Sequence, residues 1–171
     1  MSKRSPRNTA QHGTSKRSGP RHRGRSGGHQ VRERRLPRNT DPLTLDIVEI
    51  GAKGDGIARP ADAEKPYYVP LAAPGDRLVV RPTSETADFI RAEILELETP
   101  SASRQTPPCH HFGPCGGCQL QHIPEETYRR FKTALVEKAL SSHGLGDVPV
   151  RPLIALASGT RRRATLFGRV L

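Results

Sequence analysis

The sequence is poor in the residues that build a large hydrophobic core. Its 171 residues include no tryptophan, one methionine, three tyrosines and four phenylalanines, and hydrophobic residues make up 33% of the chain. The longest uncharged apolar stretch, from 152 to 160, is too short to cross a membrane. Three cysteines within ten residues exclude a disulfide framework and favour a reducing compartment. We therefore expect a soluble, cytoplasmic protein with one ordinary domain or two very small ones.

The first forty residues contain few acidic or apolar side chains. They hold twelve lysines and arginines against one acid, Glu33, and their apolar residues are Met1, Ala10, Val31 and Leu36. Such a stretch cannot bury enough surface to offset its ordering entropy, so residues 1–40 are predicted to be a disordered basic tail. The tail is either simply solvated or held near nucleic-acid phosphates by counterion release. We favour nucleic acid as its partner.

Charge is also segregated in the rest of the chain. Residues 41–99 carry 6 basic and 12 acidic side chains, whereas residues 100–171 carry 10 basic and 4 acidic ones. The strong basicity of the whole protein, with an isoelectric point near 10.4, therefore belongs to its first forty residues. The acidic middle segment is a poor surface for phosphate groups.

Residues 43–98 have the pattern of a small β-barrel. Runs rich in Ile, Val, Leu and Tyr are separated by Gly and Pro, which predicts strands at 43–50, 57–59, 67–70, 77–82 and 89–97. The glycines of Lys53-Gly54-Asp55-Gly56 can adopt positive φ in a tight turn. Five short strands in about 55 residues indicate a five-stranded OB-like barrel in a chain that is mainly β with one α-helix.

The order LDIVEIGAKGDGIAR, YYVP and AAPGDRLVVRP resembles the TRAM domain. That resemblance implies an RNA-binding barrel attached to RNA-modifying enzymes. Tyr67 and Tyr68 are of the type that stacks on bases, although at least one of them is expected to face the core. Because the segment is acidic, direct RNA contact and a role that only spaces other parts both stay open.

The cysteines form a cluster with metal-ligand spacing. Cys109, Cys115 and Cys118 stand at Cys-x5-Cys-x2-Cys, and Gly116 and Gly117 let the backbone curl so that both flanking thiolates can reach one centre. The alternative, three inert buried thiols, is rare in so polar a loop. Structural zinc would also suit this site, with a fourth ligand from the nearby histidines, which are His110, His111 and His122.

The motif CHHFGPCGGCQLQHI, followed by YRRFKTALVEKAL, resembles the iron-sulfur motif of bacterial uracil-5-methyltransferases acting on 23S ribosomal RNA. The resemblance implies a 4Fe-4S cluster on Cys109, Cys115 and Cys118, with a fourth cysteine far downstream that this chain does not contain. It implies that the nearby histidines are packing or hydrogen-bonding residues. The iron-sulfur loop and its helix would occupy residues 99–145.

A helix is predicted after the cysteines and an arginine-rich segment after the helix. Pro124 and two glutamates begin the helix, Gly144 ends it, and apolar side chains recur on one face at steps of three and four residues. Residues 148–171 resemble the start of the family's central RNA-binding domain. Arg161, Arg162 and Arg163 match the arginines of its Tyr-Arg-Arg-Arg-Ala segment, and Thr160 stands in place of the tyrosine. These arginines are our second candidates for RNA contact, with surface charge on an edge strand as the alternative.

The resemblance implies methyl transfer from S-adenosylmethionine to uracil C5, with a cysteine as nucleophile. All three cysteines of this chain are assigned to the cluster, and no glycine-rich turn suited to the cofactor's adenosine is present. We therefore assign no catalytic or S-adenosylmethionine-binding residue and expect a fragment that is inactive by itself. Two alternatives remain: an RNA-associated module without chemistry, and a small structural zinc protein.

Overall fold

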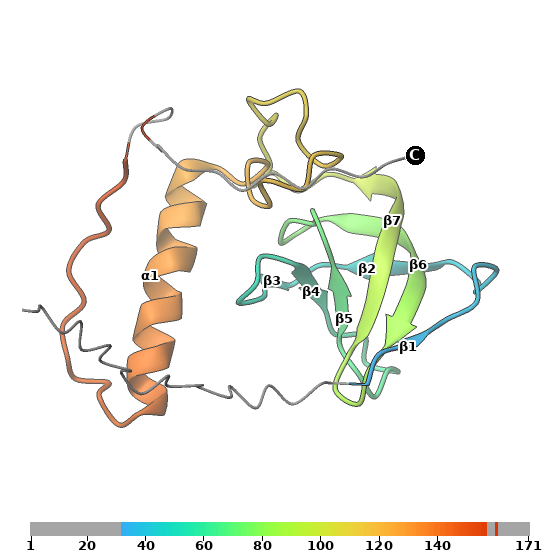
Figure 1. Cartoon of the computed structure of the whole chain (residues 1–171), viewed down its shortest axis with the longest axis horizontal. Coiled ribbons are helices and arrows are strands. Elements are labelled where there is room, and N and C mark those ends of the chain that lie inside the picture. Colours follow the sequence, from blue (N-terminus) through green and yellow to red (C-terminus); the bar gives the residue numbers. More distant parts are fainter. Residues whose placement is uncertain (1–31, 157–159, 161–171) are drawn as a thin grey trace, which may run out of the picture. The chain divides into compact units, whose positions relative to one another are not determined.

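The structure is a computed structural model, and it describes residues 32–156 and residue 160. The described residues contain seven strands and one helix (Figure 1). In chain order these are β1 (Arg34–Arg35), β2 (Leu43–Asp46), β3 (Glu49–Ile50), β4 (Gly56–Ala58), β5 (Tyr67–Val69), β6 (Arg77–Glu85), β7 (Ile90–Thr99) and α1 (Glu125–Ser142). The prediction of a mainly β chain with one helix is confirmed.

All seven strands belong to one sheet. Its order is β1-β6-β7-β5-β4-β3, and β2 also pairs with β6. The pairs are antiparallel except that of β5 with β7, in which Tyr67 lies opposite Ile90 and Tyr68 opposite Arg91. The predicted strands are thus present, and β6 and β7 are longer than the sequence indicated, running to Glu85 and Thr99.

The sheet closes on itself because β2 and β3 are two halves of one bent segment. Residues 43–46 pair with β6, and residues 49–50 pair with β4. At the bend, the Ile47 N–H donates to the Asp76 carbonyl (2.9 Å) and the Val48 N–H donates to the Ile57 carbonyl (2.9 Å). One strand therefore joins both ends of the sheet, which gives a barrel-like domain.

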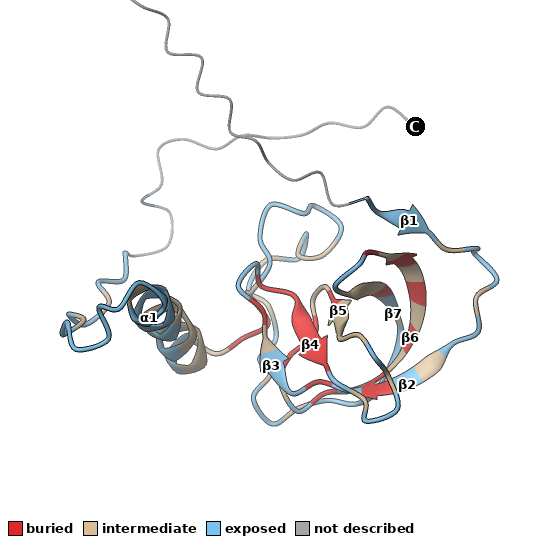
Figure 2. Ribbon diagram, turned by 90° about the horizontal axis from the view of Figure 1, so that it is seen from below, coloured by how far each residue is buried: buried red, intermediate tan, exposed pale blue. Residues whose placement is uncertain are grey.

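The core of this domain lies inside the curved sheet. Figure 2 shows β4 buried along its whole length, and β6 alternates between buried and partly exposed residues. This alternation is the period-two pattern of a strand with one face toward a core. The buried apolar cluster consists of Leu45, Ile47, Ala58, Val69, Ala72, Leu78, Val80 and Ala92, with Leu43, Tyr67 and Ile94 packed against it.

Two glycines shape the turn before β4, for different reasons. Gly54 has a φ of 95°, as predicted for a tight turn. Gly56 is a strand residue that lies close to Ala72, and a Cβ added at Gly56 would come within 2.7 Å of the Ala72 Cβ. The sequence predicted a conformational role for both glycines, but Gly56 is required for close packing.

The end of the basic tail differs from the disordered segment expected over residues 1–40. Arg34 and Arg35 pair with Glu85 and Ser84 of β6, and the Leu36 N–H donates to the Thr83 carbonyl (2.9 Å). Residues 34–36 are ordered by main-chain hydrogen bonds to the edge of the sheet, which the side chains of this stretch do not predict. Residues 1–31 lie outside the described part of the chain.

Helix α1 follows the cysteine-bearing loop and matches its predicted bounds. Glu125 and Glu126 occupy its first turn, and Glu125 accepts from Arg129 one turn later (2.6 Å). Gly144, with a φ of 74°, follows its end. No residue of α1 is buried, so its apolar face is only partly covered. None of the described helices has both the length and the apolar character needed to cross a bilayer.

Candidate functional site

The loop that carries the cysteines is attached to the barrel by an ion pair between the buried Asp76 and the partly buried Arg104. The Arg104 Nε lies 2.9 Å from both carboxylate oxygens of Asp76, and the Arg104 Nη2 donates to the Leu71 carbonyl (2.7 Å). The Asp76 side chain is fully buried and also accepts from the N–H groups of Ala73 (2.6 Å) and Ser101 (2.9 Å). Asp76 thus joins the turn before β6 to the start of the loop.

A buried histidine holds the other end of the loop. His122 is 0% exposed, and its Nε2 lies 3.3 Å from the Ala72 carbonyl, which accepts the Nε2 proton. The Gln105 N–H donates to the His122 carbonyl (2.9 Å), and the rings of His122 and Phe112 lie 5.5 Å apart. Burial lowers the pKa of His122, and Arg104 adds to this effect, while the Ala72 carbonyl and Asp76 oppose it. His122 is therefore a packing residue, as expected.

The three cysteines lie on a loop built from tight turns. Cys109 is half-buried, and Cys115 and Cys118 are exposed; all three are free thiols. The Cys115 N–H donates to the His111 carbonyl (3.1 Å), and the Cys109 N–H donates to the Gln121 Oε1 (3.3 Å). Among the described residues, no three Cys, His, Asp or Glu side chains gather into a metal-binding group. The structure places the three thiols on one loop without assembling a coordination shell.

The donor chemistry of this loop fits an iron-sulfur cluster. Thiolate sulfur is the ligand that such clusters use, and the loop carries three thiols. Gly116 has a φ of 67°, and an added Cβ there would have no atom within 4 Å outside its chain neighbours. Cys109, Cys115 and Cys118 are therefore the residues that would hold the cluster.

The two tyrosines of β5 have different environments. Tyr67 packs against the core, and its pKa is raised by burial and by the nearby carboxylates of Asp62 and Glu85. Tyr68 is half-buried, and its ring lies 4.8 Å from that of Phe89, in the turn before β7. The prediction that at least one tyrosine faces the core is confirmed.

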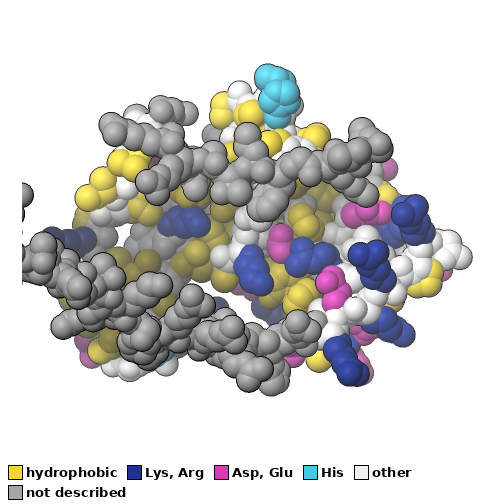
Figure 3. Space-filling view, in the orientation of Figure 1, with side chains coloured by type: hydrophobic (Ala, Val, Ile, Leu, Met, Phe, Trp, Pro, Cys, Tyr) yellow, Lys and Arg dark blue, Asp and Glu magenta, His cyan; other side chains and the backbone are white. Residues whose placement is uncertain are grey.

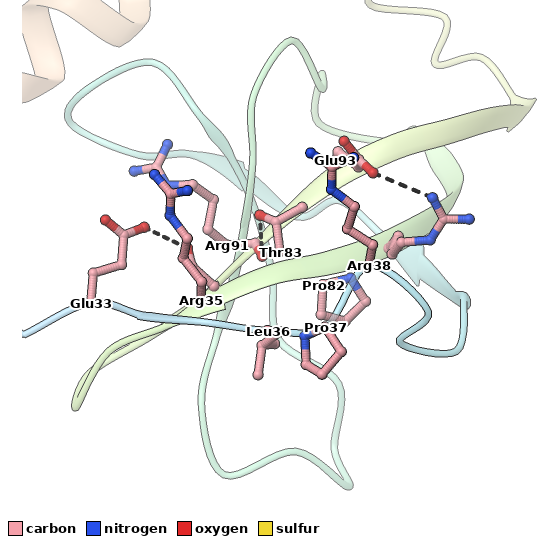
Figure 4. Close-up of a pocket in the computed structure, with 11 residues that line it drawn as sticks. Glu33, Arg35, Leu36, Pro37, Arg38, Pro82, Thr83, Arg91 and Glu93 are labelled. Atoms are coloured by element: carbon pink, nitrogen blue, oxygen red, sulfur yellow. Dashed lines mark hydrogen bonds and ion pairs between the residues drawn. The ribbon is translucent and has the colours of Figure 1, made fainter.

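An arginine-rich groove crosses β6 and β7, and the sequence analysis did not identify it. It has a volume of about 640 Å³, and its lining includes Arg35, Arg38, Arg81 and Arg91 (Figure 4). Two of these arginines come from the segment expected to be disordered, and two come from strands in a segment with net negative charge. The signal available in the sequence was the presence of four arginines between positions 32 and 38. The other predicted RNA contacts, Arg161, Arg162 and Arg163, lie outside the described residues.

Comparisons with known proteins identify relatives of this chain. It is 45% identical over 125 residues to an uncharacterized RNA methyltransferase of Caulobacter vibrioides, which covers 73% of this chain. It is 36% identical over 156 residues to the 23S rRNA (uracil(1939)-C(5))-methyltransferase RlmD of Halomonas elongata, and 32% identical over 130 residues to that of Aliivibrio fischeri; these cover 86% and 75% of this chain. The chain belongs to this family of RNA methyltransferases. No family model matches it.

The match to the family is confined to part of each relative. The matched regions are 28% of the Caulobacter protein, 32% of the Halomonas protein and 29% of the Aliivibrio protein. The chain thus spans about a third or less of the family members it matches. The activity, substrate and cofactors of a whole family member are therefore matters for proposal.

Proposed function

We propose that this chain is the RNA-engaging, cluster-bearing N-terminal part of an S-adenosylmethionine-dependent 23S rRNA uracil-5-methyltransferase. The observation that carries this proposal is the 36% identity over 156 residues to a protein named as that enzyme. The proposal assigns no catalytic residue and no S-adenosylmethionine contact to these residues, because all three cysteines are assigned to the cluster. Free thiols agree with a cytoplasmic location.

The barrel is proposed to be a five-stranded OB-like barrel of the TRAM type. Counting the bent β2–β3 segment as one strand gives the sequence 1-2-3-5-4-1 around the sheet, with the parallel pair between strands three and five. This arrangement supports the OB topology. Barrels of this kind bind nucleic acid on the face of the second and third strands and on the adjoining loops. In this chain those elements include Tyr68 and Phe89.

The loop is proposed to carry a 4Fe-4S cluster on Cys109, Cys115 and Cys118. Three observations support this: the free thiols, the open space beside Gly116 and the anchoring of both ends of the loop by Arg104 and His122. The fourth ligand would come from outside these residues. A cluster at this position would hold the loop rigidly between the barrel and α1.

RNA binding by the full chain tests this proposal. Fluorescence anisotropy with a labelled 12-nucleotide single-stranded RNA is expected to show saturable binding whose affinity falls steeply as KCl is raised from 50 to 200 mM. The basic residues of 1–40 and Arg161, Arg162 and Arg163 should contribute to the salt dependence. Absence of binding at 50 mM KCl would contradict the proposal.

A further inference from the structure

The arginine-rich groove on the outside of β6 and β7 has the properties of a phosphate-binding site. The segment from Glu33 to Arg38 forms one side of it, and residues of β6 and β7 form the rest. Figure 4 shows Arg35 and Arg91 at one end of the groove and Arg38 near Glu93 at the other. Four arginines and two glutamates line the groove, so its side chains carry a net positive charge.

Strand pairing sets the spacing of the arginines. Ser84 of β6 lies opposite Arg35 of β1 on one side and opposite Arg91 of β7 on the other. The pairing register shifts between Pro82 and Ser84, and both Thr83 and Ser84 line the groove. With strands about 4.8 Å apart, the backbones of Arg35 and Arg91 are about 10 Å apart, with a small serine between them. Two long guanidinium side chains can therefore reach one phosphate or two neighbouring ones.

The arginines of the groove are poorly neutralised by the described protein. Arg35 and Arg38 form no ion pair with a described residue. Arg81 has a buried Nε without a partner, and its Nη1 lies 3.5 Å from Glu93. Arg91 reaches Asp55 only at 3.7 Å.

Other arginines of the same sheet have closer carboxylate partners. Arg34 lies 2.8 Å from Glu85, and Arg77 lies 3.0 Å from Asp46. One acid of the groove, Glu33, is already engaged by the Ser84 hydroxyl. Figure 3 shows that lysine and arginine side chains gather on the barrel in this view, with acidic ones among them. Among the arginines of the sheet, those without a close carboxylate partner thus line the groove.

We propose that this groove binds the phosphate backbone of single-stranded RNA, with Arg35, Arg38 and Arg91 as phosphate contacts. The inference rests on the proposed function and adds a site to it. Arg91 lies opposite Tyr68 in the pairing of β5 with β7, and the Tyr68 ring contacts Phe89. Bases that extend from a backbone in the groove would meet these rings, and only unpaired bases can stack on them.

The site also accounts for RNA binding by a barrel whose own segment is acidic. Residues 41–99 carry 6 basic and 12 acidic side chains, which disfavours phosphate. Strand β1 adds arginines from outside that segment directly to the surface of β6. The end of the basic tail thus completes the phosphate-binding face of the barrel.

The test compares two double variants of the full chain that lose the same charge. Arg35→Gln/Arg38→Gln removes two groove arginines, whereas Arg59→Gln/Arg77→Gln removes two arginines that are paired with Glu49 and Asp46 elsewhere on the barrel. Affinity for a 12-nucleotide single-stranded RNA is measured by anisotropy from 50 to 200 mM KCl. Thermal melting verifies that both variants are folded.

The groove variant should bind more weakly, and its plot of log K against log [KCl] should be shallower by about 1.4, or about 0.7 for each lost contact. The control variant should retain the wild-type slope. If the chain binds RNA and the two variants have equal slopes, the proposal that the groove binds the RNA backbone is wrong, and the proposed function is unaffected. No RNA binding by the wild type would overturn both. An equal loss of affinity for a 16-base-pair RNA duplex would overturn the single-strand assignment.

Discussion

Arg104, which is partly buried, and Asp76, which is fully buried, form an ion pair that couples the cysteine-bearing loop to the barrel. The Arg104 Nε contacts both carboxylate oxygens at 2.9 Å, and the Asp76 carboxylate also accepts from two backbone N–H groups. The two residues are 28 positions apart in sequence. The geometry of the loop therefore depends on a residue of the barrel that carries no metal-ligating role.

Replacing Asp76 with alanine should destabilise the protein strongly. The Arg104 guanidinium would lose its partner in a mostly buried site, and two backbone N–H groups would lose their acceptor. We expect the free energy of unfolding in urea to fall by about 3 to 5 kcal/mol. Asp46→Ala is the matched control, because Asp46 pairs with Arg77 at the surface, where an ion pair contributes little to stability. Similar losses of stability for the two variants would show that the Asp76–Arg104 pair contributes no more than a surface ion pair.

His122 should make the protein less stable in mild acid. Burial lowers its pKa below the ordinary value of 6.5 in the folded state, so the unfolded chain binds a proton more readily. The stability that the neutral ring supplies is present above pH 6.5 and is lost as the pH falls toward the folded-state pKa. Between pH 7.5 and pH 5.5, the free energy of unfolding in urea should decrease more for the wild type than for His122→Gln. For His110→Gln, which changes an exposed histidine, the decrease should equal that of the wild type. An equal decrease for His122→Gln would show that His122 does not cause the loss of stability in acid.

Tyr68 should contribute base stacking to RNA binding. Its ring forms a pair with Phe89, Tyr68 lies opposite Arg91 of the groove, and stacking on an aromatic ring contributes about 1 to 3 kcal/mol per base. Tyr68→Ala should therefore weaken binding of a 12-nucleotide single-stranded RNA by about that amount, as measured by anisotropy. Tyr68→Phe retains the ring and should bind nearly as well as the wild type. Loss of binding in both variants would point to the hydroxyl group, not to stacking.

Gly56 should not tolerate a side chain. An added Cβ would lie 2.7 Å from the Ala72 Cβ, inside the packed barrel. Gly56→Ala should lower the free energy of unfolding by about 1 to 3 kcal/mol, the usual cost of overpacking a core. At Gly146 the nearest neighbour of an added Cβ is the flexible Ser141 hydroxyl at 3.3 Å, so Gly146→Ala should be close to neutral in the same urea titration. A neutral Gly56→Ala would mean that Ala72 can move aside at little cost.

The strands and the helix could be predicted because their apolar residues are periodic. Leu43, Leu45 and Ile47 alternate along one strand, and the positions from Tyr128 to Leu140 repeat at helical spacing. The apolar residues that form each pattern lie close together in the sequence. Their spacing is therefore sufficient to predict the strand and the helix.

Strand β1 and the anchors of the loop have no such pattern. Arg34 and Arg35 are ordered by main-chain pairing with β6 and by the contact of Arg34 with Glu85, which is 51 residues away. Arg104 contacts Asp76 across 28 residues of sequence, and His122 contacts Ala72 across 50, so local spacing does not reveal either contact. The cysteines were recognisable from spacing, but their proposed metal remains a prediction because spacing specifies donors and not their partner.

The content of iron and acid-labile sulfide tests most directly whether the loop holds a cluster. The full chain would be purified anaerobically and reconstituted with ferrous iron and sulfide in the presence of a small thiol as the external fourth ligand. We expect about four iron and four sulfide per chain for the wild type and for His110→Ala, and a large loss for Cys115→Ser. Protein that takes up neither iron nor sulfide, that binds zinc instead, or that is unaffected by Cys115→Ser would contradict the account.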